Sequence, residues 1–398
     1  METVPKVTSK NGQGLILPPD FLKRRHLPEN LEYWLDAREG ELILHPCIPD
    51  AQKLYIEATT GCNLQCRTCI RNIWDDPQAL MSRETFQNLL TSLEDLPYLQ
   101  RVIFSGFGES LTHPHILDFI ELIRKRELAV TIATNGLLIN PKIASELVKS
   151  GVDRVMISID GGKPETFADV RGALLSQIVE NIRNLNESKR QLRSLYPSIG
   201  IEFVALRSNV SELGQVSWLA SQLNVSCILV SHVLPYTEEL KGEVLYGYEP
   251  VPPFKPSSWA LRADAWIMWA SQDLPRMHWG ADRRCRFVQD HSLVVGWDGG
   301  ISPCYALSHN YRYFAIDGRE KQVSRYVFGN VNEHSLADIW MSEDYVRFRS
   351  QVKAFNFPSC PNCDLRDNCD LRSQNKGCWG WNPSCADCLW AQDIVRCP

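Results

Sequence analysis

Strand-like and helix-like segments alternate along the chain from residue 54 to about residue 233. Apolar runs rich in β-forming residues begin near Leu54, Arg101, Ala129, Arg154, Ile199 and Ser226. Helix-like stretches separate them at 82–95, 114–126, 141–150, 164–194 and 210–222. Strands that are joined by helical crossovers run parallel, so the alternation predicts an α/β fold with six parallel strands.

Three cysteines, Cys62, Cys66 and Cys69, follow the first predicted strand with three and then two residues between them. Three thiolates can hold three irons of a [4Fe–4S] cube, which leaves the fourth iron open for chemistry. Residues 53–59 alternate as a half-buried strand does, so the cysteines lie on a loop at its carboxyl end, where α/β barrels keep their active sites. A zinc site or a disulfide knot is the alternative, although zinc prefers four ligands in two short loops.

A glycine-rich segment, Ser105-Gly-Phe-Gly-Glu109, follows the second predicted strand. Its glycines allow close approach of the backbone to a ligand, and a carboxylate can accept hydrogen bonds from an ammonium group. With the three-cysteine loop, this segment resembles the radical S-adenosylmethionine (radical SAM) enzymes. The resemblance implies a partial (β/α)6 TIM-type barrel in which Gly106, Gly108 and Glu109 bind the amino group of SAM. Phe107 and Ser110 depart from the family's Gly-Gly-Glu-Pro pattern.

Other polar residues end the later strands or lie in the following helix. The resemblance implies that Asn135, Ser158 and Asp160 face the ribose and sulfonium of SAM, and that Arg171 meets its carboxylate. Simple βα turns, and a salt bridge on a helix face for Arg171, are the alternatives. His232 ends the sixth strand and is a candidate catalytic residue facing the substrate, or else a capped structural histidine.

The resemblance also implies a mechanism. One [4Fe–4S] cluster binds SAM, and an electron from a low-potential donor breaks the bond between sulfur and C5′. The resulting 5′-deoxyadenosyl radical takes a hydrogen atom from an unactivated C–H bond. The protein supplies position and excludes water, while the cofactor supplies the chemistry.

Nine more cysteines lie near the carboxyl end: Cys285, Cys304, Cys360, Cys363, Cys369, Cys378, Cys385, Cys388 and Cys397. Their spacing resembles the SPASM domain, which implies two auxiliary [4Fe–4S] clusters. Nine exceeds the eight ligands of two closed cubes by one, so the assignment of the last four stays open. A zinc ribbon of Cys360, Cys363, Cys385 and Cys388 is the alternative.

Tyr305 follows Cys304 at a position where the related anaerobic sulfatase maturases carry a catalytic aspartate. Its presence argues against that activity and makes Tyr305 a second catalytic candidate. Four segments narrow the resemblance further: 71–76, 202–206, 233–239 and 378–390. They resemble the radical SAM maturases associated with tungsten-cofactor oxidoreductases. A protein or peptide substrate is therefore expected, with a tungsten–pterin enzyme of the aldehyde oxidoreductase type as the implied partner.

The first 49 residues resemble the swapped-hairpin module of AbrB-like regulators, which implies a homodimer. They hold six Lys or Arg against seven Asp or Glu, a balance of −1. A surface that reads phosphates should be basic, so DNA binding is not expected. We predict three regions: this module at 1–49, the partial barrel at 50–255 and an iron–sulfur domain at 256–398.

The whole chain carries a net charge of −5, which predicts no general attraction to nucleic acid or anionic membrane. No run is long enough to span a bilayer and no signal peptide is evident, so a cytoplasmic location is expected. Fourteen cysteines then favour metal over disulfides. Two other functions compete: modification of a ribosomally made peptide, and a DNA-binding iron–sulfur sensor that cleaves nothing.

Overall fold

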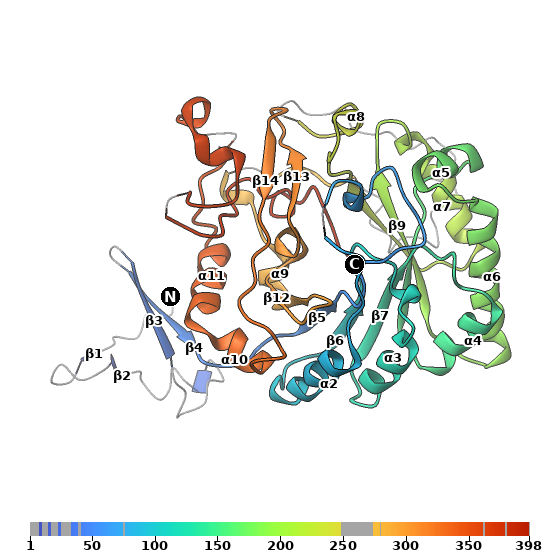
Figure 1. Cartoon of the computed structure of the whole chain (residues 1–398), viewed down its shortest axis with the longest axis horizontal. Coiled ribbons are helices and arrows are strands. Elements are labelled where there is room, and N and C mark those ends of the chain that lie inside the picture. The colour runs from blue at the N-terminus through green and yellow to red at the C-terminus, as the bar shows by residue number, and fades with distance from the viewer. Residues whose placement is uncertain are drawn as a thin grey trace.

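Six consecutive parallel strands, as the sequence predicted, make up most of an eight-stranded sheet (Figure 1). The computed structural model describes residues 8–9, 15–16, 23–24, 33–38, 41–74, 76–247, 274–278, 280–360, 363–378 and 380–397. The parallel strands are β5 (Lys53–Ile56), β6 (Arg101–Phe104), β7 (Ala129–Thr134), β8 (Arg154–Ser158), β9 (Ser198–Ala205) and β10 (Cys227–His232). They neighbour one another in sequence order, so every connection is a crossover.

Helices follow the strands and cover one side of the sheet (Figure 1). They are α2 (Arg83–Ser92), α3 (Ile116–Arg124), α4 (Pro141–Lys149), α5 (Pro164–Arg171), α6 (Leu175–Gln191) and α7 (Leu213–Gln222). Ser82 and Asn140 cap α2 and α4 by accepting from backbone N–H groups. The sequence predicted one helix over 164–194. The structure has two, because Gly172 takes the left-handed conformation at φ +68° and ends α5.

The core lies between the sheet and these helices. Ile116, Phe119, Ile120 and Ile123 recur at helical spacing on α3 and are all buried. Residues of the parallel strands are buried as well, because helices cover their outer side and side chains fill the inner side. Each fully buried aliphatic side chain contributes about 1.5–3 kcal/mol, so this region holds the site rigidly.

Two strands of the cysteine-rich region extend the barrel sheet. Strand β11 (Ser292–Val295) pairs in parallel with β5, and β12 (Ile301–Ser302) pairs antiparallel with β11. Strands β10 and β12 are therefore the two edges of the sheet, which makes the barrel partial. The predicted boundary at residue 255 separates strands of one sheet, and the division into three regions stays a prediction.

The rest of the cysteine-rich region packs beside the barrel (Figure 1). Its elements are α9 (Arg286–Gln289), the hairpin β13 (Tyr311–Phe314) and β14 (Glu320–Val323), α10 (Leu336–Met341) and α11 (Glu343–Lys353). A short helix, α8 (Glu238–Lys241), follows β10. The terminal segment returns to the barrel, where Ile394 O accepts from His232 N at 3.0 Å. The chain thus ends near the middle of the molecule (Figure 1).

The amino-terminal segment contains two antiparallel pairs, β1 (Thr8–Ser9) with β2 (Leu15–Ile16) and β3 (Tyr33–Arg38) with β4 (Glu41–Pro46). Most residues of the predicted swapped hairpin lie outside the described ranges, so that module and its dimer stay predictions. Trp34 connects the segment to the body of the molecule, since its indole donates to Met341 O at 3.2 Å.

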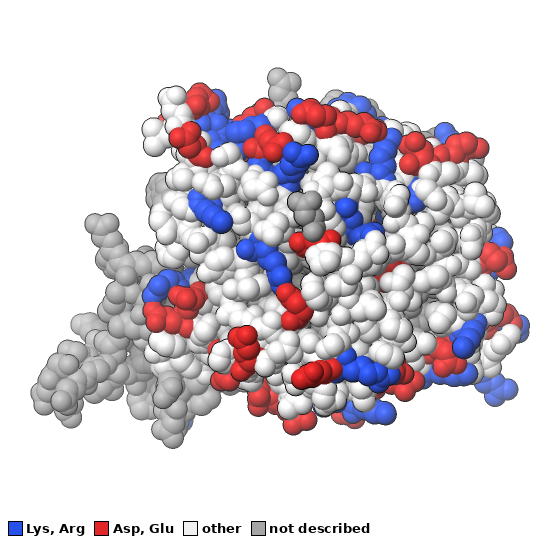
Figure 2. Space-filling view, viewed as in Figure 1, with Lys and Arg blue, Asp and Glu red and all other residues white. Residues whose placement is uncertain are grey.

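Acidic and basic side chains lie interspersed on the face shown in Figure 2, with a broad uncharged area between them. This pattern agrees with the small net charge of the chain. Among the described residues, no helix combines the length and apolar character that crossing a membrane requires.

Candidate active site

The three-cysteine loop begins where β5 ends. Thr59 and Thr60 hold it in place: Thr59 Oγ1 accepts from Gly61 N at 2.9 Å, and Thr60 Oγ1 donates to Pro77 O at 2.6 Å. Within the loop, Cys69 N donates to Cys66 O at 3.1 Å. The structure therefore places Cys62, Cys66 and Cys69 on one short, well-bonded loop at the carboxyl edge of the sheet, as predicted.

The glycine-rich segment packs directly against this loop. Glu109 N donates to Gly61 O at 2.8 Å. A Cβ on Gly108 would lie 2.0 Å from Thr59 O, and a Cβ on Gly106 would lie 2.5 Å from the Glu57 side chain. Both positions therefore need glycine, because any side chain would separate the segment from the cysteine loop.

The Glu109 carboxylate is buried and joins two strand ends. Oε1 accepts from Thr134 Oγ1 at 2.7 Å and from Leu111 N at 3.1 Å, while Oε2 accepts from Asn135 N at 2.7 Å. Burial raises the pKa of Glu109, although these hydrogen bonds favour the charged form. The contacts fix the carboxylate next to the cysteine loop, and its binding of an ammonium group stays a prediction.

Asn135 and Arg171 both reach the cysteine loop. Asn135 Nδ2 donates to Asn63 Oδ1 at 2.8 Å and lies 3.9 Å from Cys62 Sγ. Arg171 Nη1 lies 3.8 Å from Cys66 Sγ. The guanidinium thus has a place at the predicted cluster rather than on a solvent-facing side of its helix.

The structure gives Asp160 and Ser158 different positions. Asp160 is fully buried and holds Arg171 through a 2.6 Å contact between Oδ2 and Nε, while Oδ1 accepts from Val204 N at 2.7 Å. Asp160 therefore positions Arg171, and a direct contact with ribose stays a prediction. Ser158 is half-buried at the end of β8, opposite Glu202 in the ladder.

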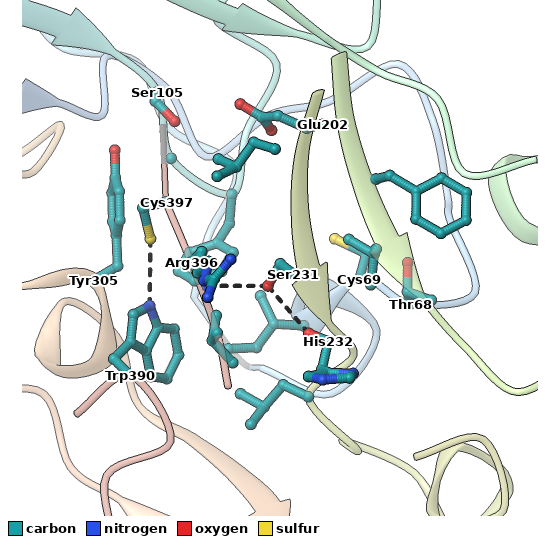
Figure 3. Close-up of a pocket in the computed structure, with 18 of the residues that line it drawn as sticks. Thr68, Cys69, Ser105, Glu202, Ser231, His232, Tyr305, Trp390, Arg396 and Cys397 are labelled. Atoms are coloured by element: carbon teal, nitrogen blue, oxygen red, sulfur yellow. Dashed lines mark hydrogen bonds between the residues drawn. The ribbon is translucent and has the colours of Figure 1, made fainter. Parts of the chain in front are cut away.

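A cavity of about 200 Å³ opens beside the cysteine loop, and we call it the reaction cavity. Figure 3 shows Thr68 and Cys69 on one side of it and Tyr305 and Cys397 on the other. Other lining residues are Ser105, Gly106, Phe107, Glu202, Ser231, His232, Tyr236, Trp390 and Arg396. The cavity therefore brings together the predicted cluster loop, the glycine-rich segment and both catalytic candidates.

Both catalytic candidates present an unpartnered polar atom. His232 is 3% exposed, and its Nε2 lies 2.9 Å from Pro275 O, so Nε2 carries the proton, and Nδ1 has no partner in the described part of the chain. Burial lowers the pKa of His232 and favours this neutral form. Tyr305 is 4% exposed, and its hydroxyl makes no hydrogen bond of ordinary geometry with a described residue, although the Ser105 side chain lies close enough to influence its pKa. Buried polar atoms seldom stay unpaired, so both indicate that a ligand occupies the cavity.

Glu202 is a cavity residue that the site prediction did not include. Its Oε1 is buried without a hydrogen-bond partner among the described residues. Burial raises the pKa of Glu202 to about 7, against the lowering influence of Arg171. A glutamate inside an otherwise apolar strand run was the signal in the sequence, because such a side chain must face an interior cavity.

A chain of three hydrogen-bonded side chains, two of them buried, was also missed. His309 Nε2 lies 2.6 Å from Glu57 Oε2, and His309 Nδ1 lies 2.5 Å from Asp76 Oδ2. Glu57 Oε1 accepts from Phe107 N at 2.7 Å. The chain therefore connects the cysteine-rich region to the glycine-rich segment. No local sequence signal joins these residues, since they lie on three distant segments.

Four auxiliary cysteines line one small cavity, and we call them the first auxiliary set: Cys285, Cys304, Cys385 and Cys388. Cys285 and Cys304 lie far from Cys385 and Cys388 in the sequence, and the fold brings the two pairs together. Buried Arg283 ties these segments by donating to Ala386 O at 2.6 Å and Phe357 O at 2.7 Å. Four thiols around one cavity are the ligands that one closed cube requires. This grouping differs from the zinc-ribbon set, which paired Cys385 and Cys388 with Cys360 and Cys363.

A second auxiliary set consists of Cys360, Cys363, Cys369 and Cys378. Burial raises the pKa of Cys378, and the nearby Cys369 and Cys363 raise it further. Burial raises the pKa of Cys360 as well, and the nearby Cys378 adds to this increase. In the described ranges no three Cys, His, Asp or Glu side chains are closed around a point where one metal ion would fit. The first set is therefore defined by a shared cavity, whereas the second set follows from the spacing of its cysteines, and the ligand roles of both stay predictions.

Cys397 is the ninth cysteine, and it lines the reaction cavity. Its sulfur accepts from Trp390 Nε1 at 3.3 Å (Figure 3). Burial raises the pKa of Cys397 to about 12, so the neutral thiol is favoured. The structure thus gives Cys397 a different environment from the eight other auxiliary cysteines.

Comparison with known proteins gives two family matches and several relatives. Residues 56–199 match the radical SAM superfamily, and residues 285–370 match an iron–sulfur cluster-binding domain. The tungsten-containing aldehyde ferredoxin oxidoreductase cofactor-modifying protein of Pyrococcus furiosus is 37% identical over 87% of this chain and 96% of its own length. The mycofactocin maturase MftC of Mycobacterium ulcerans is 30% identical over 42% of this chain and 43% of its own length.

Two solved structures share the fold. Streptococcus suis SuiB bound to S-adenosylmethionine gives a TM-score of 0.52 at 15% identity, over 82% of this chain and 73% of that one. The protein anSMEcpe with bound AdoMet and Cp18Cys peptide gives 0.53 at 17% identity, over 82% and 91%. Both support the partial barrel with a cysteine-rich extension.

Proposed function

This chain belongs to the radical SAM superfamily, and we propose that it modifies a C–H bond during maturation of a tungsten-cofactor enzyme of the aldehyde oxidoreductase type. The enzyme class and its cofactors, S-adenosylmethionine and [4Fe–4S] clusters, follow from the family. The likeness to the Pyrococcus cofactor-modifying protein carries the finer proposal, because it extends over 96% of that protein.

The residues of the site fit the cofactors of this family. Cys62, Cys66 and Cys69 supply three thiolates on one loop, and Gly106 and Gly108 leave the backbone bare beside it. When bound, the cluster and SAM supply a carbon-centred radical that can remove hydrogen from an unactivated C–H bond. The chain's own residues hold that chemistry in place and keep water away from it.

Two charged residues beside the cysteine loop and three polar residues that line the cavity fit this proposal. Glu109 and Arg171 offer opposite charges beside the cysteine loop, and these match the ammonium and carboxylate of an amino acid moiety. Glu202, His232 and Tyr305 face the remaining space and are free to bind the substrate. The substrate is a protein, a peptide or a cofactor that a protein carries, and a separate low-potential donor supplies the electron.

The competing functions have weaker support. Modification of a ribosomally made peptide draws on the likeness to the mycofactocin maturase, which covers 42% of this chain against 87% for the Pyrococcus protein. A DNA-binding sensor would need neither the glycine-rich segment nor a cavity with unpartnered polar groups. We therefore favour an enzyme that acts on a tungsten-enzyme partner.

The test uses the full chain with its clusters, reductant and SAM under anaerobic conditions. Purified tungsten-cofactor oxidoreductase, with and without its cofactor, is added, and 5′-deoxyadenosine is measured over time. We expect at least a tenfold faster release with one form of the partner, together with a mass change in that protein or its cofactor. Release that responds only to an added short peptide would favour the peptide-modifying alternative.

A further inference from the structure

We propose that Cys397 is not a cluster ligand but a hydrogen-atom donor in the reaction cavity. Four of the nine cysteines in the carboxyl-terminal region share the first auxiliary cavity, and four more form the second predicted set, so Cys397 belongs to neither set. It lines the reaction cavity instead, across from Cys69 of the predicted cluster loop (Figure 3). This role rests on the proposed function, because it requires a carbon radical as the acceptor.

The terminal segment is anchored so that Cys397 faces the cavity. Ile394 O accepts from His232 N at 3.0 Å, and Arg396 N donates to Ser231 Oγ at 3.0 Å. Asp393 holds the Arg396 guanidinium, with 2.5 Å between Oδ2 and Nη2. The segment therefore follows the end of β10 in a fixed register, and the next side chain after Arg396 enters the cavity (Figure 3).

The thiol keeps its hydrogen available. Trp390 Nε1 donates to the sulfur at 3.3 Å, so the sulfur acts as acceptor there and its own S–H is directed elsewhere. Trp390 lines both the reaction cavity and the cavity of the first auxiliary set. Trp390 therefore contacts the thiol and also borders the cavity of the first auxiliary set.

The surrounding groups indicate that a ligand comes within reach of this thiol. The Tyr305 hydroxyl and His232 Nδ1 are both more than nine-tenths buried, make no hydrogen bond of ordinary geometry with any described residue, and belong to the same cavity wall. Glu202 contributes a third unpartnered atom, Oε1. These observations are independent of the cysteine, and together they define a polar subsite for the reacting part of the substrate.

The surroundings favour transfer of a hydrogen atom over nucleophilic attack. A nucleophile or a metal ligand must be a thiolate, and a thiolate is unfavourable in a buried wall that also holds the Glu202 carboxylate. The Arg286 and Arg396 guanidinium groups, which could stabilise a thiolate, are both paired with Asp393. Homolytic transfer creates no charge, so it suits this environment.

Transfer of the hydrogen atom breaks one bond and forms one bond. The S–H bond of Cys397 breaks, a C–H bond forms on the substrate radical, and a thiyl radical is left on the sulfur. One electron from the low-potential donor and one proton from solvent then restore the thiol. Because a thiol exchanges its hydrogen with water, the new C–H hydrogen derives from solvent.

The test compares Cys397→Ser, Cys397→Ala and the matched control Cys227→Ala, which changes a cysteine outside the cavity lining. Each protein is reconstituted anaerobically, its iron is counted, and it is given dithionite and SAM alone in deuterated water. Without substrate, the carbon radical from SAM is itself the acceptor. We expect the wild type and the control to place solvent deuterium in 5′-deoxyadenosine, and both Cys397 variants to show at least a fivefold lower deuterium fraction with unchanged iron.

Loss of about four irons in either Cys397 variant would overturn the proposal, because it would show a cluster ligand. An unchanged deuterium fraction would also overturn it, as would full iron with no 5′-deoxyadenosine from either variant. Failure of the wild type to release any 5′-deoxyadenosine would instead contradict the proposed function. The deuterium fraction is a ratio, so it does not depend on how fast each variant turns over.

Discussion

Glu57 and His309 are joined by a 2.6 Å hydrogen bond between Oε2 and Nε2, although 252 positions separate them in the sequence. The other ring nitrogen of His309 meets Asp76. A ring that bonds a carboxylate at each nitrogen carries both protons and a positive charge. Burial alone would lower the His309 pKa, but Glu57 and Asp76 outweigh it, so the pKa is raised.

This pair predicts how stability depends on pH. The stabilisation is complete below the ordinary histidine pKa of about 6.5 and is lost as pH rises through the higher folded-state value. Relative to wild type, His309→Gln should therefore lower the unfolding temperature by several degrees at pH 6.5, and by less at pH 9. Calorimetry on the cluster-loaded protein measures this, with exposed His334→Gln as the control. An equal deficit at both pH values would contradict a charged His309.

Gly108→Ala should disrupt the cysteine loop. The new Cβ would lie 2.0 Å from Thr59 O and 2.9 Å from Gly61 O, and both are backbone atoms that cannot turn aside. We expect about four fewer irons per chain after reconstitution, since the loop would no longer hold its cluster. Gly247→Ala is the control, because nothing lies within 4 Å of its added Cβ. A full iron content in Gly108→Ala would show that the segment can shift.

Iron content tests the cluster assignment as a whole. Three cubes predict about twelve irons per chain, and about eight after Cys62, Cys66 and Cys69 are all changed to Ala. Metal analysis with iron and zinc measured together decides between cubes and a zinc domain. Stoichiometric zinc with only four irons would contradict two auxiliary clusters.

Removal of residues 1–49 tests the amino-terminal module. A short hairpin module cannot bury its apolar positions alone, so pairing with a second copy should make the full chain a symmetric dimer. The truncated protein should be a monomer that keeps its clusters. Light scattering measures this, and a full-length monomer would contradict the dimer. A gel shift with genomic fragments should show no tight, salt-resistant binding.

The sequence was sufficient to predict the barrel, because the signals for its strands and helices are local. Strand and helix periodicity located six of the parallel strands, and the spacing of Cys62, Cys66 and Cys69 located the predicted cluster loop. Strands β11 and β12 were missed because four and two residues are too short for a periodic signal.

The other differences between the sequence-based predictions and the structure involve contacts between residues that lie far apart in the sequence. Which cysteines share a cavity depends on how residues near 285 and near 385 are brought together, and spacing along the chain does not contain that information. Spacing along the chain likewise does not show that His309 meets Glu57 and Asp76. Nor does it show that the segment of Cys397 packs against the end of β10. Glu202 was the exception, since a glutamate within an apolar strand was visible in the sequence.

Release of 5′-deoxyadenosine from SAM by the reconstituted protein, with dithionite and without oxygen, tests the central claim most directly. Cys66 lies in the middle of the three-cysteine loop and contacts Arg171, so its substitution removes a predicted cluster ligand beside a predicted cofactor-binding residue. We predict release by the wild type and none above background by Cys66→Ala. Equal release by Cys66→Ala, or none by a fully loaded wild type given reductant and its partner, would contradict the conclusion that this chain is a radical SAM enzyme.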